Sequence, residues 1–300
     1  MRSVIVATAA LFTLSASMHA QQDFDTVQVR SQRVAEGVYM LTGAGGNIGL
    51  SIGDDAVFVV DDQYAPLTPK ILAAIAQLTN KPVRFNVNTH WHGDHTGGNE
   101  AMGKTGALLV AHDNVRRRMS SEQVIEFFQR TVPASPAGAL PVITFSDTVT
   151  FHINGDDVQA FHIAHAHTDG DAFIVWRKAN VVHAGDVFVL YGFPFIDLSS
   201  GGSIDGLIAA TDVLLTLGDD NAKIIPGHGG LSDRAAVREY GKMLKTVRDR
   251  VRQQKAAGRS LAQTLATRPT AEFDAGWGTG FIKPDQFVAM VYQSVSTTRR

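Results

Sequence analysis

The segment NTHWHGDHTGGN at residues 88–99 constrains the fold of this chain more than any other stretch. Within six positions it places four side chains that bind metals well: His90, His92, Asp94 and His95. Three nearby glycines allow a tight loop on which these groups can converge. The segment directly follows the apolar run VRFNVN (83–88), which reads as a buried strand. We therefore predict a metal site on a strand-end loop, where four ligand groups favour two ions over one.

Later parts of the chain offer further ligands in the same setting, each directly after an apolar run. The segment HIAHAHTDGDAF offers His165 and His167, VVHAGDVF offers Asp186, and IIPGHGG offers His228. The chain contains no cysteine, so a metal site here must be built from imidazole and carboxylate groups. A catalytic zinc site keeps one position open for water, which fits a cluster assembled from several loops.

The pattern of short apolar runs and helical stretches predicts an α/β fold of two sheets between helices, as a single domain over 21–300. Residues 27–62 read as an antiparallel meander, and residues 131–141 as either a flexible connector or a flap over the active site. Further strands are expected at 83–88, 107–111, 142–145, 148–154 and 157–163, and in the runs AFIVW, NVVHAG and KIIPGHG. Helices are expected at 66–80, 113–131, 203–217, 232–257 and 284–296.

The first twenty residues have the pattern of a cleaved signal peptide, with a cation at Arg2, an apolar stretch and small residues up to Ala20. We therefore expect the mature protein to be periplasmic or secreted. We expect no stable membrane insertion, because no other apolar stretch is long enough to cross a bilayer. The formal net charge of −2 gives no positive field, so we expect a small-molecule substrate and no nucleic acid. The oligomeric state stays open.

The order HWHGDH, AHTDGDA, AGDVF and PGHG resembles the metallo-beta-lactamase-fold hydrolase superfamily. The resemblance implies a four-layer αβ/βα sandwich with two zinc ions at the open edge of its sheets. It implies that the first ion is held by His90, His92 and His167, the second by Asp94, His95 and His228, and that Asp186 bridges them. His167 is preferred to His165 because Thr168 follows it, as in the superfamily's Gly-His-Thr segment. His165 is then expected beside the ligands or in the pocket, and Asp61 is expected to support the motif loop.

The same resemblance implies hydrolysis of an acyl bond by water that the two zinc ions activate, with Asp94 orienting that water and carrying its proton. A β-lactam ring is the leading substrate, because export brings an enzyme to these drugs. Asp186 stands where cysteine-containing β-lactamases have Cys, and no lysine follows it closely, so an ester, lactone or thioester is the alternative. Tyr191, Phe193 and Phe195 are expected to line the substrate pocket. An iron oxidoreductase on the same ligands is the alternative of another class.

Overall fold

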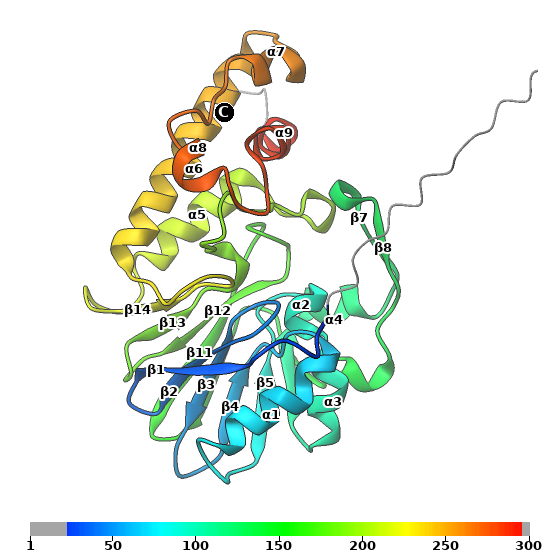
Figure 1. The fold of residues 1–300 in the computed structure, drawn as a ribbon, viewed down its shortest axis with the longest axis vertical. Coiled ribbons are helices and arrows are strands. Elements are labelled where there is room, and N and C mark those ends of the chain that lie inside the picture. The colour runs from blue at the N-terminus through cyan, green and yellow to red at the C-terminus, as the bar shows by residue number, and fades with distance from the viewer. Residues whose placement is uncertain (1–22, 296–300) are drawn as a thin grey trace, which may run out of the picture.

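A computed structural model describes residues 23–295; the predicted signal peptide lies outside them. A seven-stranded sheet is built from the first half of the chain (Figure 1). Its strands, in spatial order, are β1 (Arg30–Ala35), β2 (Val38–Thr42), β3 (Ile48–Ile52), β4 (Val57–Val60), β5 (Val83–Val87), β6 (Leu108–His112) and β9 (Ile143–Phe145). The first four form the predicted antiparallel meander. The strands β4, β5, β6 and β9 run parallel, so the loops after β4 and β5 leave the same edge of the sheet.

The second half forms a five-stranded sheet in chain order. Its strands are β10 (Thr148–Ile153), β11 (Asp156–Ile163), β12 (Asp171–Trp176), β13 (Val181–His183) and β14 (Lys223–Ile225). The edge strand β10 alternates between exposed and buried side chains, whereas β12 is buried along its whole length. This difference follows from position, because an edge strand keeps one face in solvent and an inner strand between packed layers does not.

Helices cover the outer face of each sheet, which gives the four layers that the resemblance implied. Helix α1 (Thr68–Ala76) buries Ile71 and Ile75 against the first sheet. Helices α5 (Ile204–Leu214) and α6 (Arg234–Ala256) cover the second sheet. Between the two sheets, Phe58, Phe151 and Trp176 meet edge to face.

We predicted a single helix over 113–131, and this prediction is wrong. Helix α4 (Asp113–Met119) ends early, and a hairpin follows it, made of β7 (Gln123–Ile125), the turn η2 (Glu126–Phe128) and β8 (Arg130–Val132). Gln129 adopts a left-handed conformation with φ of 49°, which no helix residue can keep. The hairpin over 123–132 therefore replaces the last part of the predicted helix and the first residues of the predicted loop.

The remainder of the predicted loop, 133–141, is tied to its neighbours. The carbonyl of Ala139 accepts a hydrogen bond from Asn99 Nδ2, and that of Pro141 accepts one from Arg116. The short helix α3 (Asn99–Lys104) thus holds this segment from one side. It connects β8 to β9, and the proposal that it moves as a flap stays a prediction.

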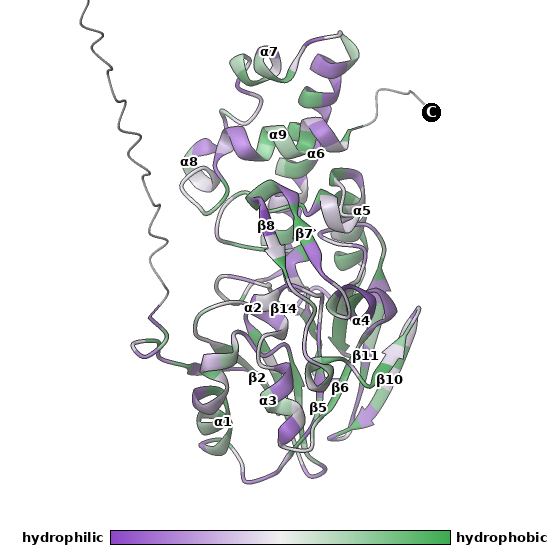
Figure 2. Cartoon of the chain, turned by 90° about the vertical axis from the view of Figure 1, so that its right-hand side faces the viewer, coloured by the Kyte–Doolittle hydropathy of each residue, from purple (hydrophilic) through white to green (hydrophobic). Residues whose placement is uncertain are grey.

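Three helices complete the C-terminal part beside α6 (Figure 1). They are α7 (Leu261–Ala266), α8 (Asp274–Trp277) and α9 (Pro284–Ser294), of which only α9 was predicted. Figure 2 shows both hydrophilic and hydrophobic residues along α6 and α9, as expected of helices that bury one side. Across residues 23–295, none of the helices combines the length and the apolar character needed to cross a bilayer.

Candidate metal centre

The motif loop leaves the end of β5 and is fixed by close backbone packing. His90 and His92 lie on the loop, and Asp94 and His95 lie on the single-turn helix α2 (Gly93–Thr96). A Cβ atom on Gly46 would lie 2.2 Å from the ring of His95, so only glycine lets the β2–β3 loop approach here. Backbone packing from a distant loop thus holds this ring in place.

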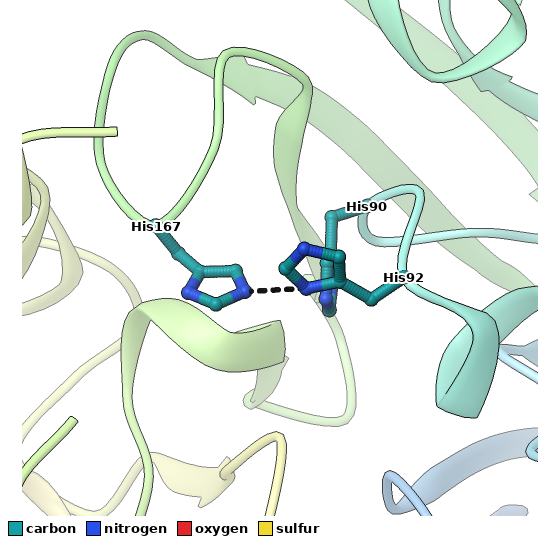
Figure 3. A group of neighbouring side chains, drawn as sticks. All are labelled: His90, His92 and His167. Atoms are coloured by element: carbon teal, nitrogen blue, oxygen red, sulfur yellow. Dashed lines mark hydrogen bonds between the residues drawn. The ribbon is translucent and has the colours of Figure 1, made fainter. Parts of the chain in front are cut away.

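The first cluster consists of His90, His92 and His167, whose ligand nitrogens lie within 4.8 Å of one another. His167 arrives on the loop before β12, and its Nε2 lies 2.9 Å from Nδ1 of His92 (Figure 3). All three side chains are buried. The structure therefore brings together two distant segments at the point that the sequence predicted.

The second cluster consists of Asp94, His95 and His228. His228 Nε2 lies 3.2 Å from Asp94 Oδ2 and 3.3 Å from His95 Nε2. Asp186 lies between the clusters: its Oδ1 is 3.2 Å from His95 Nε2, and its Oδ2 is 3.9 Å from His167 Nε2. All seven predicted ligand residues thus converge, with Asp186 beside both groups.

Hydrogen bonds at the outer ring nitrogens fix which nitrogen of each histidine faces inward. His92 Nε2 donates to Asp197 Oδ2 at 3.0 Å, and His167 Nδ1 donates to the carbonyl of Phe195 at 2.9 Å. His95 Nδ1 donates to Asp61 at 2.8 Å, and His90 Nδ1 donates to the hydroxyl of Thr89 at 3.1 Å. In neutral imidazole one nitrogen donates and the other accepts, so the inward nitrogens of His90, His92 and His167 carry lone pairs.

This donor set fits a bound cation. The buried Nε2 of His90 has no hydrogen-bond partner among the described residues. The lone pairs of His92 Nδ1 and His167 Nε2 face each other across 2.9 Å, an arrangement that repels unless a positive charge lies between them. Imidazole and carboxylate ligands together suit a divalent transition metal.

The charges around the two clusters differ. Burial and the neighbouring His95 hold the pKa of His90 well below its usual range, and burial also lowers that of His167 to about 4. Burial opposes charge on His95, but the carboxylates of Asp186 and Asp94 together raise its pKa well above the usual value. His90 and His167 are therefore neutral at neutral pH, whereas the carboxylates of Asp94 and Asp186 stabilise positive charge in the second cluster, either protons on its histidines or a bound cation.

Asp61 supports the motif loop as the resemblance implied: besides the bond from His95, it accepts bonds from the backbone and hydroxyl of Thr89. His165 does not take the supporting position that we expected. Its side chain is exposed and its Nδ1 bonds to the carbonyl of Gly201. Asp197, which the sequence analysis missed, supports His92 instead. Its place directly after the apolar run FPFI was the available signal.

The family model of the metallo-beta-lactamase superfamily matches residues 41–228, which is more than half of the chain and contains both clusters. The chain belongs to the metallo-beta-lactamase superfamily. It is thus a metal-dependent hydrolase.

Solved structures share the fold of this superfamily member. A metallo-beta-lactamase from Pontibacter korlensis is similar with a TM-score of 0.61 and 18% identity over 73% of this chain and 99% of that one. The DIM-1 metallo-beta-lactamase gives 0.59 and 18% over the same shares. The inverting sec-alkylsulfatase Pisa1 from Pseudomonas sp. gives 0.67 and 16% over 90% of this chain and 51% of that one.

A cavity of about 370 Å³ opens above the clusters of this metallo-beta-lactamase superfamily member, within the size range of small-molecule sites. Asp94, Asp186 and His228 reach it, and Tyr191 and Phe195 line it as predicted. Phe193 does not: it is fully buried and stacks on Phe287 with ring centroids 4.9 Å apart. Lining residues that the sequence analysis missed come from the hairpin and the C-terminal part: Ile125, Phe128, Arg130, Val132 and Phe281.

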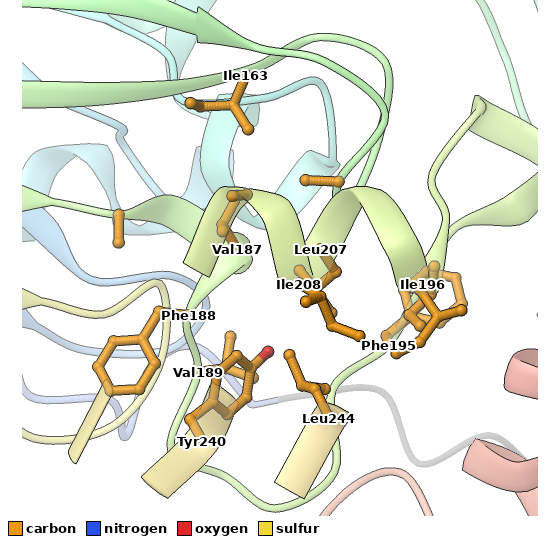
Figure 4. Packing of buried hydrophobic residues seen from close by; sticks show 14 of the residues in the cluster. Ile163, Val187, Phe188, Val189, Phe195, Ile196, Leu207, Ile208, Tyr240 and Leu244 are labelled. Atoms are coloured by element: carbon orange, nitrogen blue, oxygen red, sulfur yellow. The ribbon is translucent and has the colours of Figure 1, made fainter. Parts of the chain in front are cut away.

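The segment that carries Asp186 is anchored from below. The next three residues, Val187, Phe188 and Val189, are buried against α5 and α6 (Figure 4). Tyr240 of α6 meets the ring of Phe188 at 5.2 Å. The apolar run after Asp186 is therefore core, and the cavity wall begins only at Tyr191.

Proposed function

We propose that the mature chain is an exported hydrolase with two zinc ions that opens a β-lactam ring, with an ester, lactone or thioester as the alternative acyl substrate. The observation that carries this proposal is the convergence of two ligand clusters around Asp186 beneath one cavity. Paired metal sites of this kind serve displacement reactions at carbonyl or similar centres.

The cluster His90, His92 and His167 would hold the first ion, and Asp94, His95 and His228 the second, with Asp186 between them. Bound there, the two ions would polarise the acyl carbonyl and lower the pKa of the attacking water. Burial opposes ionisation of Asp94, but His95 and His228 lower its pKa to about 2. Its carboxylate is thus ionised at neutral pH and, facing the cavity, can accept a hydrogen bond from the attacking water and pass the proton of that water to the leaving group.

Tyr191 supplies a neutral hydrogen-bond donor on the other side. Burial and the nearby Asp186 raise the pKa of its phenol well above the usual value, so it keeps its proton. Its oxygen accepts a bond from the backbone of Phe195, which leaves the hydroxyl hydrogen free to point at the cavity. We infer that this hydroxyl donates a hydrogen bond that stabilises the negative charge developing on the substrate or leaving group.

Two arguments support a β-lactam as the first substrate to test. The fold is similar to structures named as metallo-beta-lactamases, and the signal-peptide pattern would bring the chain to the compartment where these drugs act. The ester, lactone or thioester alternative follows from Asp186, which replaces a thiolate with a harder carboxylate ligand.

The test is hydrolysis of a chromogenic β-lactam by the protein purified without residues 1–20, before and after a chelator and with zinc added back. Turnover that the chelator removes and zinc restores would support the proposal. If a protein carrying two zinc ions hydrolyses an ester, lactone or thioester but no β-lactam, the alternative replaces it. Iron as the bound metal, with no hydrolysis of any of these, would contradict it. Fractionation of the native host would test export separately.

A further inference from the structure

The hairpin β7–β8 presents one of its faces to the cavity. Ile125 pairs directly with Arg130, and Gln123 with Val132. Directly paired residues share a face, and residues two apart on a strand do so as well. Ile125, Arg130 and Val132 therefore point the same way, and all three line the cavity above the clusters. The turn places Phe128 beside them.

Arg130 is the single arginine or lysine among the described residues that line this cavity. Within residues 23–295, its side chain makes no hydrogen bond and no ion pair. Its charge acts on the neighbouring Tyr64, whose pKa burial nevertheless raises to about 12. The guanidinium group, with five N–H donors in a planar fork, matches a carboxylate.

The mouth of the cavity is apolar and aromatic. We call Phe128, Phe195, Tyr191 and Phe281 the aromatic rim. The ring of Phe128 lies 4.8 Å from that of Phe195 and 5.6 Å from that of Phe281, which in turn lies 6.1 Å from Tyr191. Phe128 and Phe281 remain 38% and 63% exposed. Exposed aromatic rings gathered around a pocket mark a surface that binds apolar groups.

The aromatic rim is assembled from three distant segments. Phe128 lies on the hairpin turn, Tyr191 and Phe195 follow Asp186, and Phe281 lies between α8 and α9. Phe281 also lies beyond residues 41–228, which the family model matches. The C-terminal part thus adds to the cavity a side chain that family membership alone does not supply.

We propose that this cavity selects amphipathic anions, with Arg130 binding a substrate carboxylate set apart from the scissile bond and the aromatic rim binding an apolar group. The inference deepens the proposed function and rests on it. It assigns specificity to the hairpin and the C-terminal part, whereas the ligand clusters carry the chemistry.

A binding measurement tests the inference without turnover. Calorimetry with the zinc-loaded protein would compare 4-phenylbutyrate with its neutral amide. Arg130→Gln should weaken binding of the carboxylate about tenfold and leave the amide unchanged, because a charge-assisted hydrogen bond is lost. Any binding of the carboxylate to the metals contributes equally in the wild type and in Arg130→Gln, so the difference between their association constants reports the contact with Arg130. Arg117→Gln, which removes an exposed charge on α4 outside this cavity, should change neither.

A second variant tests the apolar contact. Phe281→Ala should weaken both probes about fivefold, because the aromatic contact does not depend on charge. The inference is overturned if the wild-type protein binds neither probe. It is also overturned if the Arg130→Gln variant binds the carboxylate as tightly as the wild type. If the wild-type protein shows the expected binding pattern but hydrolyses no β-lactam, ester, lactone or thioester, the proposed function is overturned instead. The two failures are therefore distinguishable.

Discussion

Asp197 shows how one acidic side chain decides the state of a ligand. Its Oδ2 accepts from His92 Nε2, while its Oδ1 accepts from the hydroxyl of Ser199 at 2.5 Å and the backbone of Ser200 at 3.1 Å. Burial opposes ionisation of Asp197, but the bond from His92 lowers its pKa well below the usual value. The carboxylate therefore holds the His92 ring with its Nδ1 turned to the first cluster.

Replacing Asp197 by Ala should weaken metal binding at the first cluster about 10- to 100-fold, the usual loss when such a supporting group is removed. The ring of His92 would lose its orientation and its preference for the tautomer with a free Nδ1. Competition with a chromogenic chelator measures the affinity. Asp197→Asn, which keeps an acceptor oxygen, should lose less.

A matched control separates this effect from local damage to the loop. Ser199→Ala removes the other side-chain partner of Asp197 without touching His92, and metal affinity should stay at the wild-type value. Wild-type affinity in Asp197→Ala would contradict the assigned orientation of His92.

At the scale of elements, the centre depends on how closely the strand-end loops approach one another. The loop after β14 crosses the loop after β13, and the backbone of Gly227 donates to the carbonyl of Gly185 at 2.8 Å. A Cβ atom on Gly227 would lie 2.0 Å from Asp186 Oδ1. No room is left between these two loops for any side chain.

Gly227→Ala should therefore displace the Asp186 carboxylate or the loop that carries His228, and reduce zinc-dependent hydrolysis at least about 100-fold, as a shift of about 1 Å in a reacting group does. Gly230→Ala, three residues along the same loop, is the control, because nothing lies within 4 Å of the Cβ it would add. Steady-state kinetics with metal analysis would measure both variants. Equal activity in the two would refute the packing argument.

The ligand residues were predictable because they are dense, lie beside glycines and follow apolar runs. The hairpin was not, because VIEFF offers a short apolar run without clear helical or strand period, and the hairpin begins only a few residues after a true helix. The sequence also could not separate Phe193 from Phe195, because the two lie two positions apart in one apolar run. Only the packing of Phe193 against Phe287 makes it a core residue, whereas Phe195 lines the cavity. The apolar run before Asp197 could mark it as a candidate, but its partner His92 lies 105 positions away, and no local pattern identifies that partner.

At the scale of the whole molecule, the two sheets must keep their relative position for the clusters to form. An asparagine side chain connects the two halves of the fold at each end. Asn47, before β3, donates through Nδ2 to the carbonyls of Pro226 and Gly229, both at 2.9 Å, beside His228. Asn154, in the turn after β10, bonds to Ser51 and to the backbone of Ala56. Because β11 is eight residues long, Asn154 lies about 25 Å from the His167 loop.

Asn47→Ala should lower the free energy of unfolding by about 1–3 kcal/mol, since it leaves two carbonyls without their donor. It should also weaken metal binding at the second cluster about tenfold, because the loop that carries His228 loses the side-chain tether from Asn47, and of the bonds from residue 47 only the backbone one to Gly227 stays. Asn154→Gly suits the left-handed φ of 54° at that position and removes the side-chain bonds of the other connection, while the backbone bond to Asp55 stays. It should cost a similar free energy and leave metal affinity unchanged. Urea unfolding with chelator competition measures both quantities, and a loss of affinity in both variants would mean that the centre depends on overall stability rather than on the tether at Asn47.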